Sequence, residues 1–160
     1  MRKETDLSRV HAATSLKKTV GDSVRIGVVT AEWNPDITQA MRDACIEALV
    51  SHGVNENRIQ SVSVPGSFEL PYAAQQMIQR DGMDAVICIG CVIQGETRHF
   101  EFIAQATAQG IMRVALENNT PVIFGVLTTQ NMQQALDRAG GAHGNKGVEA
   151  ALTCLKMLSL

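Results

Sequence analysis

Strand-like and helix-like segments alternate along the chain from Ser23 onward, and this alternation restricts the possible folds more than any other feature of the sequence. Strands that alternate with helices at this spacing form a parallel sheet through right-handed crossover connections. We therefore predict an α/β fold with three layers, in which helices flank a four-stranded parallel sheet on both faces.

The strands are predicted at residues 24–30, 59–64, 85–93 and 121–127. The runs at 24–30 and 85–93 consist mostly of apolar or β-branched residues, which is typical of strands covered on both faces. Helical spacing of apolar residues predicts helices at about residues 35–52, 68–80, 98–117, 130–139 and 146–158. The predicted inner stripe of the long third helix consists of Ile103, Ala106, Gly110, Ile111 and Val114.

The first 22 residues differ from the rest of the chain. They contain no convincing helix or strand, and residues 1–20 carry five basic and two acidic side chains. We expect an N-terminal extension over residues 1–22 that runs into solvent or reaches a neighbouring chain. The remaining residues, 23–160, have the length of one ordinary domain.

The composition argues against several classes of protein. A net charge of −2, from 14 basic and 16 acidic residues, disfavours binding to nucleic acid or to a membrane surface. No apolar run approaches the roughly 18 residues of a membrane span, and the N-terminus lacks the apolar stretch of a signal peptide. Four cysteines do not make a disulfide scaffold in a chain of this length. We expect a soluble cytoplasmic protein with reduced thiols.

Ligands of an open parallel sheet bind beyond the carboxyl ends of its strands, where this chain has unusual turns. The first of these turns contains Trp33, the only tryptophan, which serves either as packing or as a flat surface for stacking a ring. The second contains Ser67, a candidate N-cap, and Glu69, an acid in the first turn of a helix. The same groups are suited to reading a heterocycle that has several hydrogen-bond donors and acceptors.

The third turn, Gly95-Glu96-Thr97-Arg98-His99, precedes the long helix. Free N–H groups at a helix start form an anion site, and Thr97 adds a hydroxyl donor. The turn is neither a Walker A loop nor a GxGxxG fingerprint, so a nucleoside triphosphate or a dinucleotide is not indicated. The positive end of the helix dipole disfavours an imidazolium, so His99 is expected to be neutral and able to accept a proton, although an isolated histidine is often merely structural.

Other combinations of residues carry less information. Cys88 and Cys91 have redox spacing, but they lie within a predicted strand that points their sulfurs to opposite faces, so we interpret them as core residues. The histidines and cysteines form no metal-ligand cluster. Arg138 and Lys146 flank a glycine-rich stretch, where they either meet an anionic ligand or face solvent.

Several motifs, taken together, resemble the lumazine synthase family. In chain order they are Trp33-Asn34, the segment VPGSFELP at 64–71, GCVIQGETRHFE at 90–101, PVIFGVLTT at 121–129, Arg138-Ala139-Gly140 and GNKGVE at 144–149. The match runs from about Val24 to the C-terminus. The resemblance implies a flavodoxin-like fold and the penultimate step of riboflavin biosynthesis. In that step a transferase condenses 5-amino-6-(D-ribitylamino)uracil with 3,4-dihydroxy-2-butanone 4-phosphate and releases phosphate and water.

The resemblance also implies roles for individual residues. Trp33 would stack on the pyrimidine, and His99 would donate and accept protons. The other residues that would hold the pyrimidine and its ribityl chain are Ser67, Phe68, Glu69, Cys91, Val92, Ile93 and Phe124. The phosphate of the second substrate would bind to Glu96 and Thr97, joined by Arg138 of an adjacent subunit.

The resemblance further implies that the reaction needs no metal or redox cofactor. Members of the family assemble as homopentamers, and some pack twelve pentamers into a hollow icosahedral shell. Riboflavin synthase, which acts next in the pathway, is a candidate partner. The chain departs from the family at Gln94, where many relatives have Arg, and at Ala142, where many have Lys, so we expect weaker phosphate binding.

Two other functions are compatible with parts of the sequence. A non-catalytic flavin- or pteridine-binding module would keep Trp33 and the turn at 65–69 but would not need His99 and Arg138. A purely structural shell protein would leave the residues of all these turns unconstrained. The presence of every motif in one chain favours the enzyme.

Overall fold

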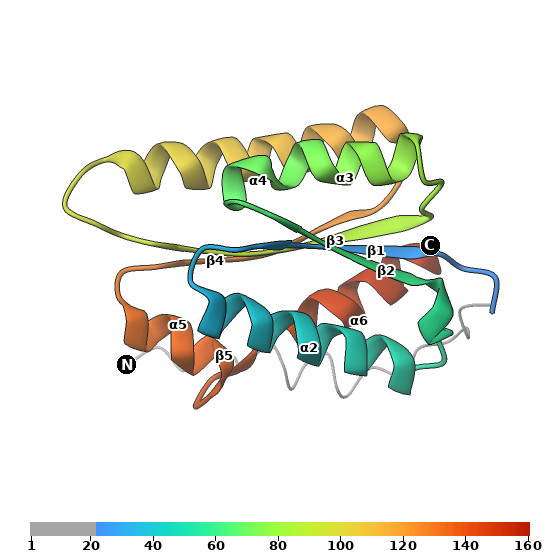
Figure 1. Ribbon diagram of the computed structural model, residues 1–160, viewed down its shortest axis with the longest axis horizontal. Coiled ribbons are helices and arrows are strands. Elements are labelled where there is room, and N and C mark those ends of the chain that lie inside the picture. The colour runs from blue at the N-terminus through green and yellow to red at the C-terminus, as the bar shows by residue number, and fades with distance from the viewer. Residues whose placement is uncertain (1–21) are drawn as a thin grey trace.

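Four parallel strands form the centre of the protein in the computed structural model, which describes residues 22–160 (Figure 1). The strands are β1 (Ile26–Ala31), β2 (Ile59–Val64), β3 (Ala85–Ile93) and β4 (Val122–Thr129). Their order in the sheet is β2-β1-β3-β4, a flavodoxin-like arrangement. The predicted α/β class and parallel sheet are confirmed, whereas the predicted extension at residues 1–22 lies, apart from Asp22, outside the described residues.

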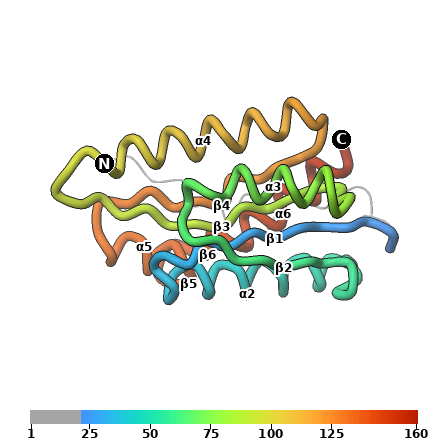
Figure 2. Tube along the Cα trace, turned by 45° about the horizontal axis from the view of Figure 1, so that its top comes forward, coloured from blue at the N-terminus to red at the C-terminus, as the bar shows by residue number. Residues whose placement is uncertain are grey.

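Helices cover both faces of the sheet, as predicted (Figures 1 and 2). One face carries α3 (Leu70–Gln79) and α4 (His99–Asn118), which pack side by side. The other face carries α2 (Pro35–Ser51), α5 (Met132–Arg138) and α6 (Lys146–Leu158). Short 3₁₀ turns, η1 (Glu56–Arg58) and η2 (Ser67–Glu69), border β2, and the glycine-rich stretch forms a small hairpin of β5 (Ala139–Gly141) and β6 (Gly144–Asn145).

Each face of the sheet buries its own apolar cluster, because successive side chains of a strand point to opposite faces. Cys88 packs with the residues under α3 and α4, whereas Cys91 belongs to the cluster under α2 and α6. All four cysteines are buried and free, so the interpretation of Cys88 and Cys91 as core residues is confirmed.

The inner stripe of α4 agrees with the prediction only in part, because Ile103, Ala106 and Gly110 are partly buried. Ile111 and Val114 are buried as expected, but the third fully buried side chain is Thr107, which hydropathy alone did not select. Gly110 is only partly buried and lies against Pro71, where an added Cβ would approach the proline Cγ to 2.7 Å. Thus α3 and α4 approach each other closely at this glycine.

The close approach of α2 and α6 fixes the start of α6. A Cβ at Gly147 would overlap the main-chain oxygen of Met41, so only glycine fits there. Asn145 caps the helix, because its side chain accepts a hydrogen bond of 2.8 Å from the Gly147 N–H. The motif at residues 144–149 therefore sets the place from which Lys146 and Glu149 project. No helix within residues 22–160 is long and apolar enough to cross a membrane.

The buried thiols make stability sensitive to alkaline pH. Burial raises the pKa of all four thiols, and that of Cys45 and of Cys88 from 9.0 to about 12, so these thiols stay protonated in the folded chain when those of the unfolded chain ionise. The unfolded state then binds fewer protons. Above about pH 9 the free energy of unfolding should fall by up to about 1.4 kcal/mol per pH unit for each buried thiol.

Denaturant titrations between about pH 8 and pH 11 measure this slope. Cys88→Ala removes one of the four buried thiols, so the slope should become shallower in that variant whatever its stability at neutral pH. A free energy of unfolding that stays flat over this range contradicts the prediction.

Candidate active site

The turns after β1, β2 and β3 converge at one edge of the sheet and enclose a pocket of about 470 Å³, which we call the rim pocket. Its walls come from the start of α2, the η2 turn, the end of β3 and the start of α4. The lining residues are Trp33, Asn34, Gly66, Ser67, Phe68, Glu69, Cys91, Val92, Ile93, His99 and Ile103. Most of the residues expected to hold the pyrimidine therefore lie beside the expected proton-transfer residue.

Trp33 presents an indole that is 72% exposed. Its turn is held against the end of β2, because the Glu32 N–H donates to the Val64 oxygen at 2.8 Å and the Trp33 N–H to the Pro65 oxygen at 3.3 Å. The ring lies next to Gly66, where an added Cβ would be 3.3 Å from the Trp33 Cδ1. So exposed a ring contributes little to packing, and the geometry favours a stacking surface.

The second turn corrects one prediction. Ser67 does not cap a helix, because η2 begins there and the carboxylate of Glu69 instead accepts a hydrogen bond of 3.0 Å from the Gly66 N–H. Ser67 is 5% exposed and lies against Gly90 of β3, where an added Cβ would overlap the serine hydroxyl. Phe68 is 58% exposed. Glu69 therefore has a structural role in the turn, and the turn still presents Phe68 to the pocket.

The third turn is exposed from Gln94 to His99. The hydroxyl oxygen of Thr97 accepts a hydrogen bond of 3.3 Å from the His99 N–H, and no described residue accepts the hydroxyl proton, which can be donated to a ligand. No atom lies within 4 Å of the place that a Cβ at Gly95 would occupy. The backbone of this loop and the start of α4 are thus open to an anion.

Cys91 lines the rim pocket but is poorly suited to attack a substrate. Burial raises the pKa of its thiol to about 11, and a protonated thiol is a weak nucleophile at neutral pH. Within residues 22–160 there is also no group of three histidine, cysteine or acidic side chains that could hold a metal ion. The polar side chains that line the pocket are those of Asn34, Ser67, Glu69 and His99.

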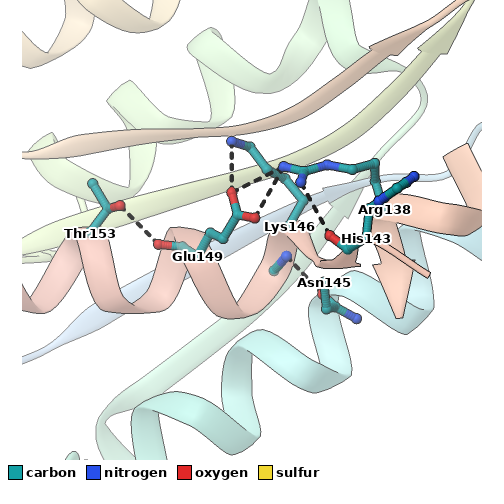
Figure 3. Close-up of polar contacts among 7 residues, drawn as sticks. Arg138, His143, Asn145, Lys146, Glu149 and Thr153 are labelled. Atoms are coloured by element: carbon teal, nitrogen blue, oxygen red, sulfur yellow. Dashed lines mark hydrogen bonds and ion pairs between the residues drawn. The ribbon is translucent and has the colours of Figure 1, made fainter. Parts of the chain in front are cut away.

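Arg138 lies elsewhere, in an ion-pair cluster that we call the Arg138 group: Arg138, Lys146 and Glu149 (Figure 3). The Nη2 of Arg138 donates to both carboxylate oxygens of Glu149, at 3.0 and 3.2 Å, and its Nη1 to the His143 oxygen at 3.2 Å. Lys146 Nζ is 3.3 Å from the same carboxylate, whose side chain is 4% exposed. Neither cation simply faces solvent, and the group carries one net positive charge.

Phe124 is also outside the rim pocket. It lies on the edge strand β4, is 37% exposed, and lines a cavity of about 710 Å³ bordered by α4 and α6, which we call the β4 cavity. Lys146 and Glu149 line the same cavity. The expected site residues of one chain thus fall into two sets: those of the rim pocket and its loop, and those at the β4 edge.

Comparison with known proteins identifies the family of this chain. The sequence profile of 6,7-dimethyl-8-ribityllumazine synthase matches residues 23–160. The chain is 57% identical over 133 residues to the 6,7-dimethyl-8-ribityllumazine synthase of Cytophaga hutchinsonii, which covers 83% of this chain and 84% of that protein. It is 50% identical over 140 residues to the synthase of Porphyromonas gingivalis, with 88% and 87% covered. The chain belongs to the 6,7-dimethyl-8-ribityllumazine synthase family.

Sequence reasoning missed several residues of the rim pocket and of the Arg138 group. Asn34, Gly66 and Ile103 line the rim pocket without having been assigned to it, although two of them stand inside the motifs that carried the resemblance. Glu149 was missed because an acid in the first turn of a helix usually faces solvent. The available signal was its spacing of three residues from Lys146, which places both side chains on one helix face.

We expect Trp33→Ala to weaken binding of the ribitylaminouracil by about 1–3 kcal/mol, the usual contribution of an aromatic side chain stacked on a base. Fluorescence titration measures the dissociation constant of the wild type, whose only tryptophan should change its emission on binding. Calorimetry measures the dissociation constant of the variant, which has no tryptophan.

Tyr72→Ala is the matched control, because Tyr72 is 69% exposed on α3 and does not line the rim pocket. Unchanged emission on binding, together with an unchanged dissociation constant in Trp33→Ala, would make the indole a surface residue without this role.

Proposed function

We propose that the rim pocket of one chain and the β4 edge of a neighbouring chain together form the active site of this lumazine synthase. As a member of the family, the chain is a transferase of riboflavin biosynthesis that produces 6,7-dimethyl-8-ribityllumazine. Its substrates are 5-amino-6-(D-ribitylamino)uracil and 3,4-dihydroxy-2-butanone 4-phosphate. The observation that carries the proposal is the exposed Trp33 ring in one pocket with His99, beside a loop open to an anion.

The pyrimidine binds in the rim pocket. It stacks on Trp33, while the turn with Ser67, Phe68 and Glu69 holds the ring and the ribityl chain from one side and residues 91–93 hold them from the other. Phe124 of the neighbouring chain closes the pyrimidine side. The exposure of both Trp33 and Phe124 supports this arrangement, since two aromatic faces left open in one chain are covered when a flat ring lies between chains.

The phosphate of the second substrate binds at the loop before α4. Glu96 receives it through its main-chain N–H and Thr97 through its hydroxyl, together with the N–H groups at the helix start, and Arg138 of the neighbouring chain supplies the positive charge. A guanidinium forms charge-assisted hydrogen bonds, which are about twice as strong as neutral ones. The openness of the loop and the net positive charge of the Arg138 group support this role.

His99 transfers protons in the reaction. The amino group of the uracil forms an imine with the ketone and releases water, and phosphate then leaves. The ribitylamino nitrogen closes the second ring on the remaining carbonyl, which releases a second water. Each step moves protons, and a positioned histidine contributes about 10²–10⁴ in rate. Holding the two substrates together contributes more, about 7–11 kcal/mol, so catalysis depends chiefly on the geometry of the shared site.

A shared site requires assembly, and we propose a homopentamer. The β4 cavity offers the surface for it, with exposed apolar side chains at Met112, Leu116, Phe124 and Met157. We further propose that twelve pentamers pack into an icosahedral shell and that riboflavin synthase is a partner. We also propose that the protein is cytoplasmic, and the four free cysteines support this location. Sedimentation velocity separates a pentamer from a shell by mass.

A turnover assay with the two substrates tests the function directly, because the lumazine product absorbs at longer wavelength than the pyrimidine. A non-catalytic flavin- or pteridine-binding module would bind the pyrimidine and form no product. A structural shell protein would do neither.

His99→Ala should lower kcat by about ten- to a thousandfold and leave measurable turnover, because positioning survives the loss of the imidazole. Steady-state kinetics measure the effect. His52→Ala is the control, since His52 is exposed beyond the end of α2 and away from the rim pocket. Full activity in His99→Ala would exclude the proton-transfer role.

Arg138→Ala should raise the KM for the butanone phosphate much more than the Kd for the ribitylaminouracil, because only the former carries a phosphate. Arg113→Ala is the control for loss of an arginine, since Arg113 forms an exposed ion pair with Glu117 on α4. Equal effects on both substrates would instead indicate a general disturbance of the β4 edge.

The same variant tests whether the site is shared. Arg138→Ala chains, mixed with chains that carry both Thr97→Ala and His99→Ala and reassembled from dissociated subunits, should regain part of the activity. Random mixing places an intact loop beside an intact Arg138 at some interfaces. Subunit exchange without recovered activity would place the whole site within one chain.

A further inference from the structure

Asn34 has an unusual backbone conformation at the rim pocket. Its φ and ψ are 58° and 59°, and among the described non-glycine residues only Asn119 shares a positive φ. Asparagine tolerates this left-handed region better than most residues, but Pro35 follows directly, and a proline favours extended backbone in the residue before it. Such a conformation persists only where several contacts hold it.

The side chain of Asn34 does not form the hydrogen bond that is expected of an N-cap asparagine. Asn34 is the N-cap of α2, where asparagine normally accepts a hydrogen bond from the first turn of the helix, yet it makes no such bond. Its Nδ2 instead donates to the main-chain oxygen of Cys91 at 3.1 Å, 57 residues away in the sequence. The main-chain oxygen of Asn34 accepts from the N–H groups of Ile37 and Thr38, both at 3.0 Å.

The hydrogen bond from Asn34 to Cys91 lies where β3 extends beyond the end of its pairing with β1. Pairing of β1 with β3 ends at Thr30 and Ile89, whereas β3 continues in register with β4 as far as Ile93. The Cys91 oxygen therefore lies beyond the last strand partner on the β1 side, and a main-chain oxygen in this place needs another donor. The Asn34 amide supplies it.

The bond also joins two walls of the rim pocket. Trp33 directly precedes Asn34, and Val92 directly follows Cys91; all four residues line the pocket. The turn is already tied to β2 through the N–H groups of Glu32 and Trp33. The Asn34 amide joins the same turn to β3 through a hydrogen bond. This bond therefore fixes the distance between the indole of Trp33 and the end of β3.

We propose that Asn34 is a positioning residue, whose amide sets the width of the slot between Trp33 and residues 91–93 that receives the pyrimidine. The inference rests on the proposed function, because the slot is defined by the ring that it takes. Asn34 acts through Trp33 and the β3 end and takes no part in proton transfer. Its loss should therefore affect the pyrimidine far more than the butanone phosphate.

Two substitutions test this role. Asn34→Gly keeps the left-handed backbone accessible and removes the amide, and Asn34→Asp keeps the shape but points an acceptor at the Cys91 oxygen. We expect the KM and Kd for the ribitylaminouracil to rise about three- to tenfold in Asn34→Gly, the range for loss of one hydrogen bond, and at least about tenfold in Asn34→Asp. The KM for the butanone phosphate should stay within about twofold, and the emission maximum of Trp33 in the free protein should shift in both variants.

Asn118→Asp is the matched control. Its amide donates to the Val114 oxygen at 2.8 Å near the end of α4, so this variant loses a bond of the same kind away from the rim pocket. It should alter the free energy of unfolding but leave both the Trp33 emission and the Kd for the ribitylaminouracil unchanged.

Wild-type affinity and emission in Asn34→Gly and Asn34→Asp, with only a stability loss like that of Asn118→Asp, would overturn the inference and leave the proposed function intact. A parallel rise in the KM of both substrates would also overturn it, because a local slot acts on the pyrimidine alone. A wild-type protein without turnover would overturn the proposed function, and this inference with it.

Discussion

The site depends on the unequal lengths of the strands in the parallel sheet. β3 and β4 remain paired as far as Ile93 and Thr129, whereas β1 leaves β3 after Thr30 and turns into α2. Residues 90–93 of β3 are therefore left without a strand on one side. This notch at the carboxyl edge is where the turns after β1 and β2 meet the end of β3, and the backbone groups exposed there must be satisfied by side chains or by a ligand.

Most of the fold could be predicted because burial on both faces leaves a strong signal. The run at 85–93 is apolar throughout and coincides with β3, and the helix predicted at 146–158 coincides with α6. The first strand was predicted two residues too early, at Val24, because hydropathy does not record where pairing with β2 and β3 begins. Thr107 was missed for a related reason, since its burial follows from the direction of α4 and not from its polarity.

The rim pocket was predictable as a place, because strand ends in a parallel sheet meet at one edge. Its detailed bonding was not. Ser67 is a good N-cap by type, but the carboxylate of Glu69 takes the Gly66 N–H and the helix begins with a 3₁₀ turn. The bond from Asn34 to Cys91 joins residues far apart in the sequence and depends on strand lengths, which no local pattern reveals.

The Arg138 group satisfies a buried carboxylate and still keeps the positive charge that the proposed function requires of it. A buried carboxylate without partners is strongly unfavourable, and Glu149 has both Arg138 and Lys146 within hydrogen-bond distance. Two cations around one carboxylate leave a net charge of +1, so a bound phosphate does not have to displace Glu149. In the loop before α4, Gln94 is neutral and Arg98 is paired with Glu101 at 3.2 Å. Under the proposed function, phosphate binding should therefore depend on the Arg138 group of the neighbouring chain, and so on assembly.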